Sequence, residues 1–145
     1  MPDDDPMDVP RVIETMTRAL RLQWRSTLQY STMSATLTGP DGAALAELFR
    51  EYAGAELADA ARLTEKLVAL GGTPPTDVPN LTMGSTSATS LAALADGDDE
   101  TIAALHAVIE HSGQEPRSEA LEHLLEHLIL RKQQQVDLIR RALSD

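Results

Sequence analysis

The chain has 145 residues, and 23 Asp and Glu against 12 Lys and Arg give a formal net charge of -11. This length fits one domain, and so strong a negative charge argues against binding to nucleic acid or to a membrane surface. The absence of cysteine excludes disulfides, thiolate nucleophiles and Cys-ligated metal sites. The amino-terminal stretch is acidic where a signal peptide is basic and then apolar, so we expect a cytoplasmic protein. We expect a single domain over residues 1–145, with residues 1–8 flexible.

Leucine and alanine recur at intervals of three and four residues along most of the chain, which predicts helices. The first predicted helix begins at Pro10 and ends at the turn formed by residues 38–41. The second carries an apolar stripe from Leu45 to Leu70 and ends at two glycines followed by prolines. Because the link between these helices is very short, they should be antiparallel neighbours.

Residues 71–90 are rich in Gly, Pro, Thr and Ser and are too many for a tight turn, so they predict a long crossover. The third predicted helix runs from Leu91 to Ile109 and contains Gly97, at a cost of about 1 kcal/mol relative to alanine. A shorter helix capped by Asp98 or Asp99 is the alternative.

The fourth predicted helix follows Pro116 and carries the clearest stripe, from Leu121 to Ala142. The three links between the predicted helices are short, long and short, which is the pattern of two antiparallel helical hairpins packed side by side. The sequence therefore predicts an all-α, antiparallel four-helix bundle with one long crossover between its second and third helices.

Polar residues interrupt the apolar stripe of every predicted helix. These interruptions fall at matching heights along the predicted bundle. Buried polar and charged groups are tolerated when they are paired, hydrogen-bonded or bound to metal, so the matching heights need a common explanation. We expect these side chains to converge as either a metal site or an ion-pair network. They are Gln23, Glu56, Asp59, Asp98, Lys132 and Gln135, with Asp98 somewhat nearer the start of its helix than the others are to theirs.

Three segments resemble the bacterioferritin-like and Dps-like members of the ferritin-like superfamily: the spacing from Gln23 to Tyr30, the run Glu56-Leu57-Ala58-Asp59 leading to LVALGGTPP, and LLEHLILRKQQQVDLI. The resemblance covers essentially the whole chain. It implies a bundle with Glu on the first helix, Glu-x-x-His on the second, Glu on the third and Glu-x-x-His or an acidic variant on the fourth, which hold two irons that oxidise Fe(II) or activate oxygen.

Glu56 alone matches that pattern unchanged. The resemblance places Gln23, Asp59, Asp98, Lys132 and Gln135 at the remaining ligand positions. The family's haem is not expected, because Leu57 stands where a bacterioferritin carries its ligand methionine.

The charges of this set disfavour a di-iron centre. Three carboxylates, two amides and one ammonium do not match the four or so carboxylates and neutral imidazoles that two irons need. We therefore expect no cofactor, with Lys132 paired to Glu56 and Asp59 in place of metal. The alternative is one divalent cation, with Mg, Ca or Mn favoured over Fe, on oxygen atoms of the set Gln23, Glu56, Asp59, Asp98 and Gln135.

His123 and His127 have the i, i+4 spacing of a helical metal pair, but without a third ligand in the sequence they are predicted to be surface residues.

The leading hypothesis is a ferritin-like protein with a degenerate di-metal site, without ferroxidase activity and without assigned catalytic residues, that acts as an oligomeric structural or partner-binding protein. The alternative is an active ferroxidase-like protein of iron storage or oxidation, or another di-metal carboxylate oxidase. Trp24 and Leu28 on the flank of the first helix, with Ala46, Ala53 and Ala60 on the second, predict a homodimer or a higher homo-oligomer. The sequence identifies no protein partner.

Overall fold

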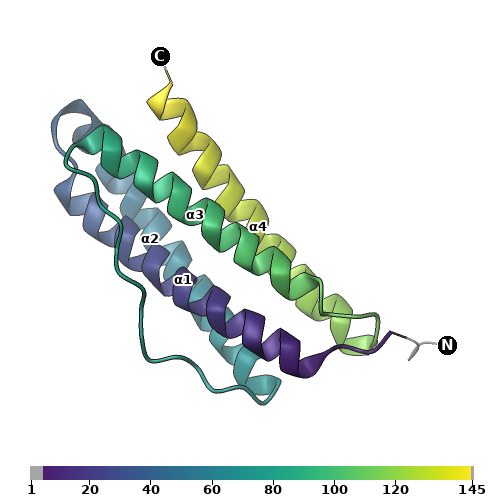
Figure 1. The fold of residues 1–145 in the computed structure, drawn as a ribbon. Coiled ribbons are helices and arrows are strands. Elements are labelled where there is room, and N and C mark those ends of the chain that lie inside the picture. The colour runs from purple at the N-terminus through teal and green to yellow at the C-terminus, as the bar shows by residue number, and fades with distance from the viewer. Residues whose placement is uncertain (1–4, 145) are drawn as a thin grey trace.

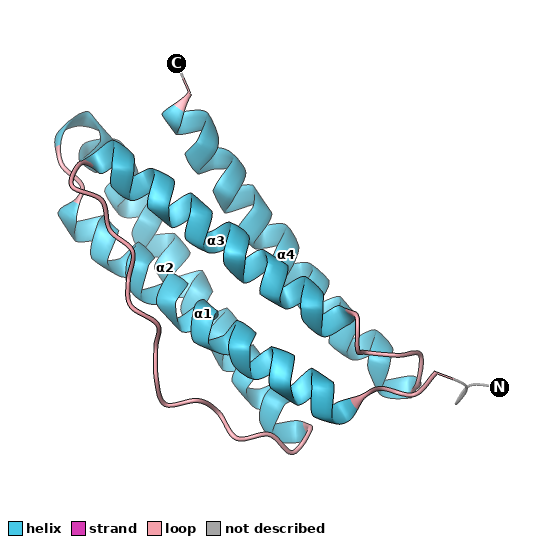
Figure 2. Ribbon diagram, in the orientation of Figure 1, coloured by secondary structure: helices cyan, strands magenta, loops and turns pink. Residues whose placement is uncertain are grey.

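The computed structural model describes residues 5–144, apart from the side chain of Asp41. Its elements are four helices: α1 (Val9–Thr36), α2 (Gly39–Ala69), α3 (Ser87–Ile109) and α4 (Pro116–Leu143). They pack as a bundle, and the long connection runs between α2 and α3 (Figures 1 and 2). The predicted all-α bundle with one crossover is confirmed. Within the described part of the chain, no helix is long and apolar enough to cross a membrane.

The α1–α2 connection is shorter than the predicted turn. Only Leu37 and Thr38 separate the helices. The reversal is made at Gly39, whose φ of 65° lies in the left-handed region that glycine adopts without strain. Pro40 then occupies the first turn of α2, where its missing N–H leaves no hydrogen bond unmade.

Helix α3 begins at Ser87, four residues before Leu91, and passes through Gly97 without interruption. Its start is a capping box in which the Thr86 hydroxyl accepts a hydrogen bond from the Thr89 amide and the Thr89 side chain binds the Thr86 amide. The alternative of a shorter helix capped by Asp98 or Asp99 is therefore wrong. The crossover is correspondingly shorter than predicted and spans residues 70–86.

The crossover lies along α1. Arg21 forms an ion pair of 2.9 Å with Asp77, and the Gln29 side chain exchanges hydrogen bonds with the backbone of Thr82. The Arg21 guanidinium holds the pKa of the Asp77 carboxyl below its usual value. These contacts hold an otherwise irregular segment in place.

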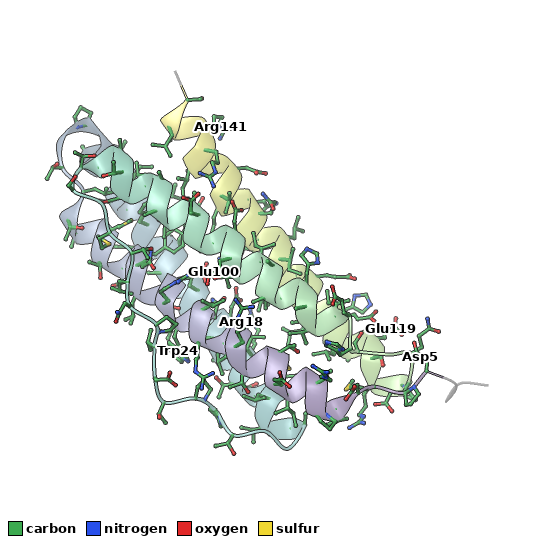
Figure 3. The ribbon with its side chains drawn as sticks, in the orientation of Figure 1. Asp5, Arg18, Trp24, Glu100, Glu119 and Arg141 are labelled. Atoms are coloured by element: carbon green, nitrogen blue, oxygen red, sulfur yellow. The ribbon has the colours of Figure 1, made fainter. Side chains whose placement is uncertain are left out.

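Residues 5–8, part of the segment expected to be flexible, bind the α3–α4 loop. The Gln114 amide donates to the Asp5 carbonyl at 2.6 Å, the Asp8 amide donates to the His111 carbonyl at 3.0 Å, and Met7 is buried. Asp5 thus lies at the end of the bundle where α4 begins, as does Glu119 (Figure 3). Residues 1–4 lie outside the described part of the chain.

Two apolar clusters fill the bundle, one on each side of a polar layer. Members of the first include Met16, Leu63, Leu105 and Leu125, and members of the second include Tyr30, Phe49, Leu94 and Ile139. Of the four neighbouring helix pairs, α2 and α4 approach each other least closely. The seam between them is where long polar side chains have room to cross.

Gly97 gives a test of the α3 backbone. A Cβ at this position would meet Arg25 Nη2 at 3.4 Å, an ordinary contact with the end of a side chain. We expect Gly97→Ala to stabilise the protein by about 0.5–1 kcal/mol, because alanine loses less backbone entropy than glycine in a helix. Urea unfolding would measure this change.

Gly113→Ala is the matched control. Gly113 has φ 66°, and an added Cβ would lie 2.6 Å from the Asp5 carbonyl oxygen, so this variant should lose stability. A loss of stability in Gly97→Ala as well would contradict the interpretation of α3 as an unstrained helix.

Candidate functional site

The six polar residues singled out from the sequence lie together between the two apolar clusters. Each of them is at most 1% exposed. They come from all four helices: Gln23 from α1, Glu56 and Asp59 from α2, Asp98 from α3, Lys132 and Gln135 from α4. We call this set, with Arg131, Ser26 and Tyr30, the polar layer.

Glu56 is the centre of the polar layer. Lys132 Nζ donates to Glu56 Oε2 at 2.6 Å, and Gln135 Nε2 donates to Oε1 at 2.9 Å. Gln23 Nε2 donates both to Oε2 and to the Glu56 backbone carbonyl. A carboxylate this buried is stable only with such donors, since desolvation otherwise costs several kcal/mol.

Asp59 does not pair with Lys132, which corrects the prediction. Its Oδ2 accepts hydrogen bonds from Nε and Nη2 of Arg131, and its Oδ1 accepts one from Arg62 Nη1 at 3.0 Å. The reason is helical geometry: neighbouring residues point about 100° apart. Arg131 therefore faces Asp59 across the seam between α2 and α4, while Lys132 points to the bundle centre.

Asp98 lies on the other side of Lys132. Ser26 Oγ donates to Asp98 Oδ1 at 2.8 Å, Tyr30 Oη donates to Oδ2 at 2.5 Å, and Lys132 Nζ lies 3.8 Å from Oδ1. Burial raises the pKa of the Asp98 carboxyl, and the nearby Glu56 charge adds to this, against the lowering effect of Lys132.

Tyr30 remains a hydrogen-bond donor to this carboxylate. Burial and the Asp98 charge raise the pKa of its phenol well above the usual value. Its ring meets Phe49 and Tyr52 edge to face, at centroid distances of 5.3 and 5.6 Å, so the phenol is also fixed by packing.

Arg131 was not singled out from the sequence, yet it is the member of the layer that reaches the surface, with 21% of its side chain exposed. It lines a cavity of about 250 Å³ between α2 and α4, together with Glu51, Tyr52, Ala55, Gln134 and Gln135. Its position next to Lys132 in the sequence was the available signal. The distance from Arg131 to Asp59 across the seam is not readable from the sequence.

The charges of the layer balance once Arg131 and the mostly exposed Arg62, which contacts the layer from outside, are both included. Three carboxylates, Glu56, Asp59 and Asp98, contact three cations, Arg62, Arg131 and Lys132. The cations predicted from the sequence left a surplus of negative charge; the two arginines remove it.

The donor set does not fit the two irons that the family resemblance implies. Each oxygen of the three carboxylates accepts a hydrogen bond from an N–H or O–H group. Two metal ions would compete with these donors and would lie against Lys132 and Arg131. In residues 5–144, no group of three or more His, Cys, Asp or Glu side chains is arranged to hold a metal ion.

Gln23 Oε1 is the exception to this saturation. Among the described residues it is the buried side-chain oxygen or nitrogen without a hydrogen-bond partner. One amide oxygen is a weak ligand on its own. His123 and His127 lie outside the polar layer on the exposed face of α4, with His123 3.5 Å from Glu119.

Residues 13–145 match the family described as Ferritin-like domain. The chain belongs to the ferritin-like family. No curated protein sequence matches it significantly.

Two solved structures have the same ferritin-like fold. One, of ferritin-like, diiron-carboxylate proteins from Bacillus anthracis str. Ames, has a TM-score of 0.85 and 24% identity and covers 94% of this chain and 98% of that chain. The other is a dodecameric thioferritin, the bacterioferritin-related protein from Bacteroides fragilis, with a TM-score of 0.83 and 16% identity over 94% of this chain and 86% of that chain. At these identities the likeness concerns the fold alone.

The buried pair predicts a large effect of Lys132→Met. This ferritin-like core would then hold Glu56 without its closest cation, and breaking a buried pair from one side costs about 3 to 5 kcal/mol. Urea unfolding at neutral pH would measure the loss.

Arg62→Met is the matched control, because Arg62 pairs with Asp59 of the same layer but its side chain is 53% exposed. We expect it to cost less than about 1 kcal/mol. If Lys132→Met cost no more than Arg62→Met, the buried pair would not be a determinant of stability.

Proposed function

We propose that this ferritin-like protein lacks ferroxidase activity and that its polar layer is a structural ion-pair network. The observation that carries the proposal is the Lys132 ammonium, 0% exposed and 2.6 Å from Glu56 Oε2, at the centre of the donor set. A fixed ammonium occupies carboxylate lone pairs that a redox metal would need. The rival function is an iron-oxidising or other di-metal protein that uses Glu56, Asp59 and Asp98.

Iron oxidation separates the two functions directly. With Fe(II) added at two ions per chain under air, stopped-flow absorbance should rise no faster than in protein-free buffer, because the layer has no position for two irons. Glu56→Gln should match the wild type. A wild-type rate well above buffer that Glu56→Gln abolishes would establish the rival.

We further propose that the protein works as a homo-oligomer through the outer face of α1, α2 and the crossover. Large apolar side chains are exposed there: Leu28 (44%), Leu57 (51%), Val68, Val78, Leu81 and Met83. Because α1 packs on α2 and the crossover lies along α1, these residues belong to neighbouring elements, and contiguous exposed apolar surface is typical of protein–protein contacts. The dodecameric state named for the Bacteroides fragilis protein adds support.

Two of the three alanines that the sequence suggested for this contact, in contrast, pack within the chain. Ala60 is fully buried in one apolar cluster, and Ala53 packs against the other. Trp24 also packs partly against the core, which leaves Leu28 as the exposed residue of that flank. The cytoplasmic location and the binding of a protein partner remain predictions.

Light scattering tests the assembly. We expect a mass of at least twice the 15.7 kDa of one chain at micromolar concentration, and a shift toward 15.7 kDa in the double variant Leu28→Glu/Leu57→Glu. Burying the two introduced charges would oppose association. Leu130→Glu, at a position on α4 that is 60% exposed and lies outside these elements, is the control and should keep the wild-type mass. A wild-type mass of 15.7 kDa at all concentrations would contradict assembly.

A further inference from the structure

Lys132 and Arg131 are neighbours on α4 but divide the polar layer between them. Lys132 Nζ lies 2.6 Å from Glu56 Oε2 and 3.8 Å from Asp98 Oδ1. Arg131 pairs with Asp59 Oδ2, and its Nη2 lies 3.6 Å from the other Glu56 oxygen, Oε1. Lys132 therefore contacts Asp98, Arg131 contacts Asp59, and the two cations share Glu56; Asp59 Oδ1 also pairs with the mostly exposed Arg62 at 3.0 Å.

This layout is that of two cations joined by a common carboxylate, with one terminal carboxylate on each side. We propose that Lys132 and Arg131 are internal substitutes for two metal ions, one for each half of the layer. The inference rests on the proposed structural role of the layer. It adds a second cation, Arg131, and assigns the carboxylates of the layer to two halves. The inner half is Lys132, Asp98 and Glu56 Oε2; the outer half is Arg131, Asp59 and Glu56 Oε1.

Each half also contains an amide oxygen. In the inner half, Gln23 Oε1 is buried without a hydrogen-bond partner. In the outer half, Gln135 Oε1 accepts a hydrogen bond from Arg131 Nη1. Removal of either cation thus leaves two carboxylates and an amide oxygen, with Arg62 still paired to Asp59 Oδ1 in the outer half. Such hard oxygen donors suit a divalent ion such as Mn²⁺.

The two halves differ in their access to solvent. The Lys132 side chain is 0% exposed, whereas the Arg131 side chain is 21% exposed and lines the cavity between α2 and α4. Loss of Arg131 therefore leaves carboxylates that an ion reaches through this cavity. The outer half is the easier half to convert.

The test compares wild type, Arg131→Met, Lys132→Met, the double variant and Arg62→Met. Each is purified with chelator, then titrated with MnCl₂ by calorimetry and melted with chelator or with Mn²⁺. We expect the single variants to melt roughly 5–15 °C below wild type in chelator, to bind one Mn²⁺ per chain, and to gain melting temperature as Mn²⁺ rises. The double variant should bind two.

Wild type and Arg62→Met are the controls and should neither bind Mn²⁺ stoichiometrically nor change their melting temperature with it. Arg62 contacts Asp59 but is mostly exposed. The Arg62→Met variant therefore distinguishes the loss of any arginine near Asp59 from the loss of Arg131. Since Arg131 is partly exposed, Arg131→Met carries the test if Lys132→Met does not fold.

Arg131→Met that neither binds Mn²⁺ nor gains melting temperature with it would overturn the inference. That failure leaves the proposed function standing, because wild type without metal remains a structural network. Stoichiometric Mn²⁺ binding by wild type, together with its Fe(II) oxidation, would instead overturn the proposed function. The two failures are seen in different proteins and are therefore distinguishable.

Discussion

The buried ion pair between Lys132 and Glu56 is the constraint on which the rest of the bundle depends. Both side chains are 0% exposed, so their desolvation has to be offset by contacts within the protein. Glu56 meets this requirement with donors from α1 and α4, and Lys132 with carboxylates from α2 and α3. A pair that needs partners from all four helices ties their relative heights together. The apolar clusters on either side add stability, but leucines that face leucines tolerate sliding far better than charges do.

This dependence bears most on α2 and α4, the neighbouring helices that approach each other least closely. A shift of α4 by one turn moves its side chains by about 5.4 Å, enough to separate Lys132 from Glu56 and Arg131 from Asp59 together. Both cations would then be buried or half-buried without partners. The polar layer therefore selects one register across a seam where apolar contacts alone would distinguish several, as single buried polar residues do in coiled coils.

Periodicity alone predicted much of this molecule: the four helices, the crossover, and the six residues that meet in the layer. It worked because each polar interruption stood on an apolar stripe, and a stripe fixes which side of a helix faces the core. It failed where the outcome depends on distances between helices. The partner of Asp59 was misassigned and Arg131 was overlooked, because the width of the seam between α2 and α4 has no signature in the sequence. The start of α3 was missed for a different reason: its cap is a pair of threonines in a Ser- and Thr-rich segment, where many hydroxyls are equally plausible caps.

A ferritin-like fold with side-chain cations at its centre has a different source of stability from one that binds ions. A bound metal stabilises by mass action, so the folded fraction follows the supply of that metal. Lys132 and Arg131 are attached to α4, so their local concentration is fixed once the helix is in place, and the cost of ordering them is part of folding. A cation that is part of the chain offers no open coordination position, which a bound metal needs in order to react with oxygen. Under the proposed function, retention of the bundle and absence of iron oxidation have one cause, since cations fixed on α4 take the place of metal ions; a fold shared with diiron-carboxylate proteins does not by itself imply a shared reaction.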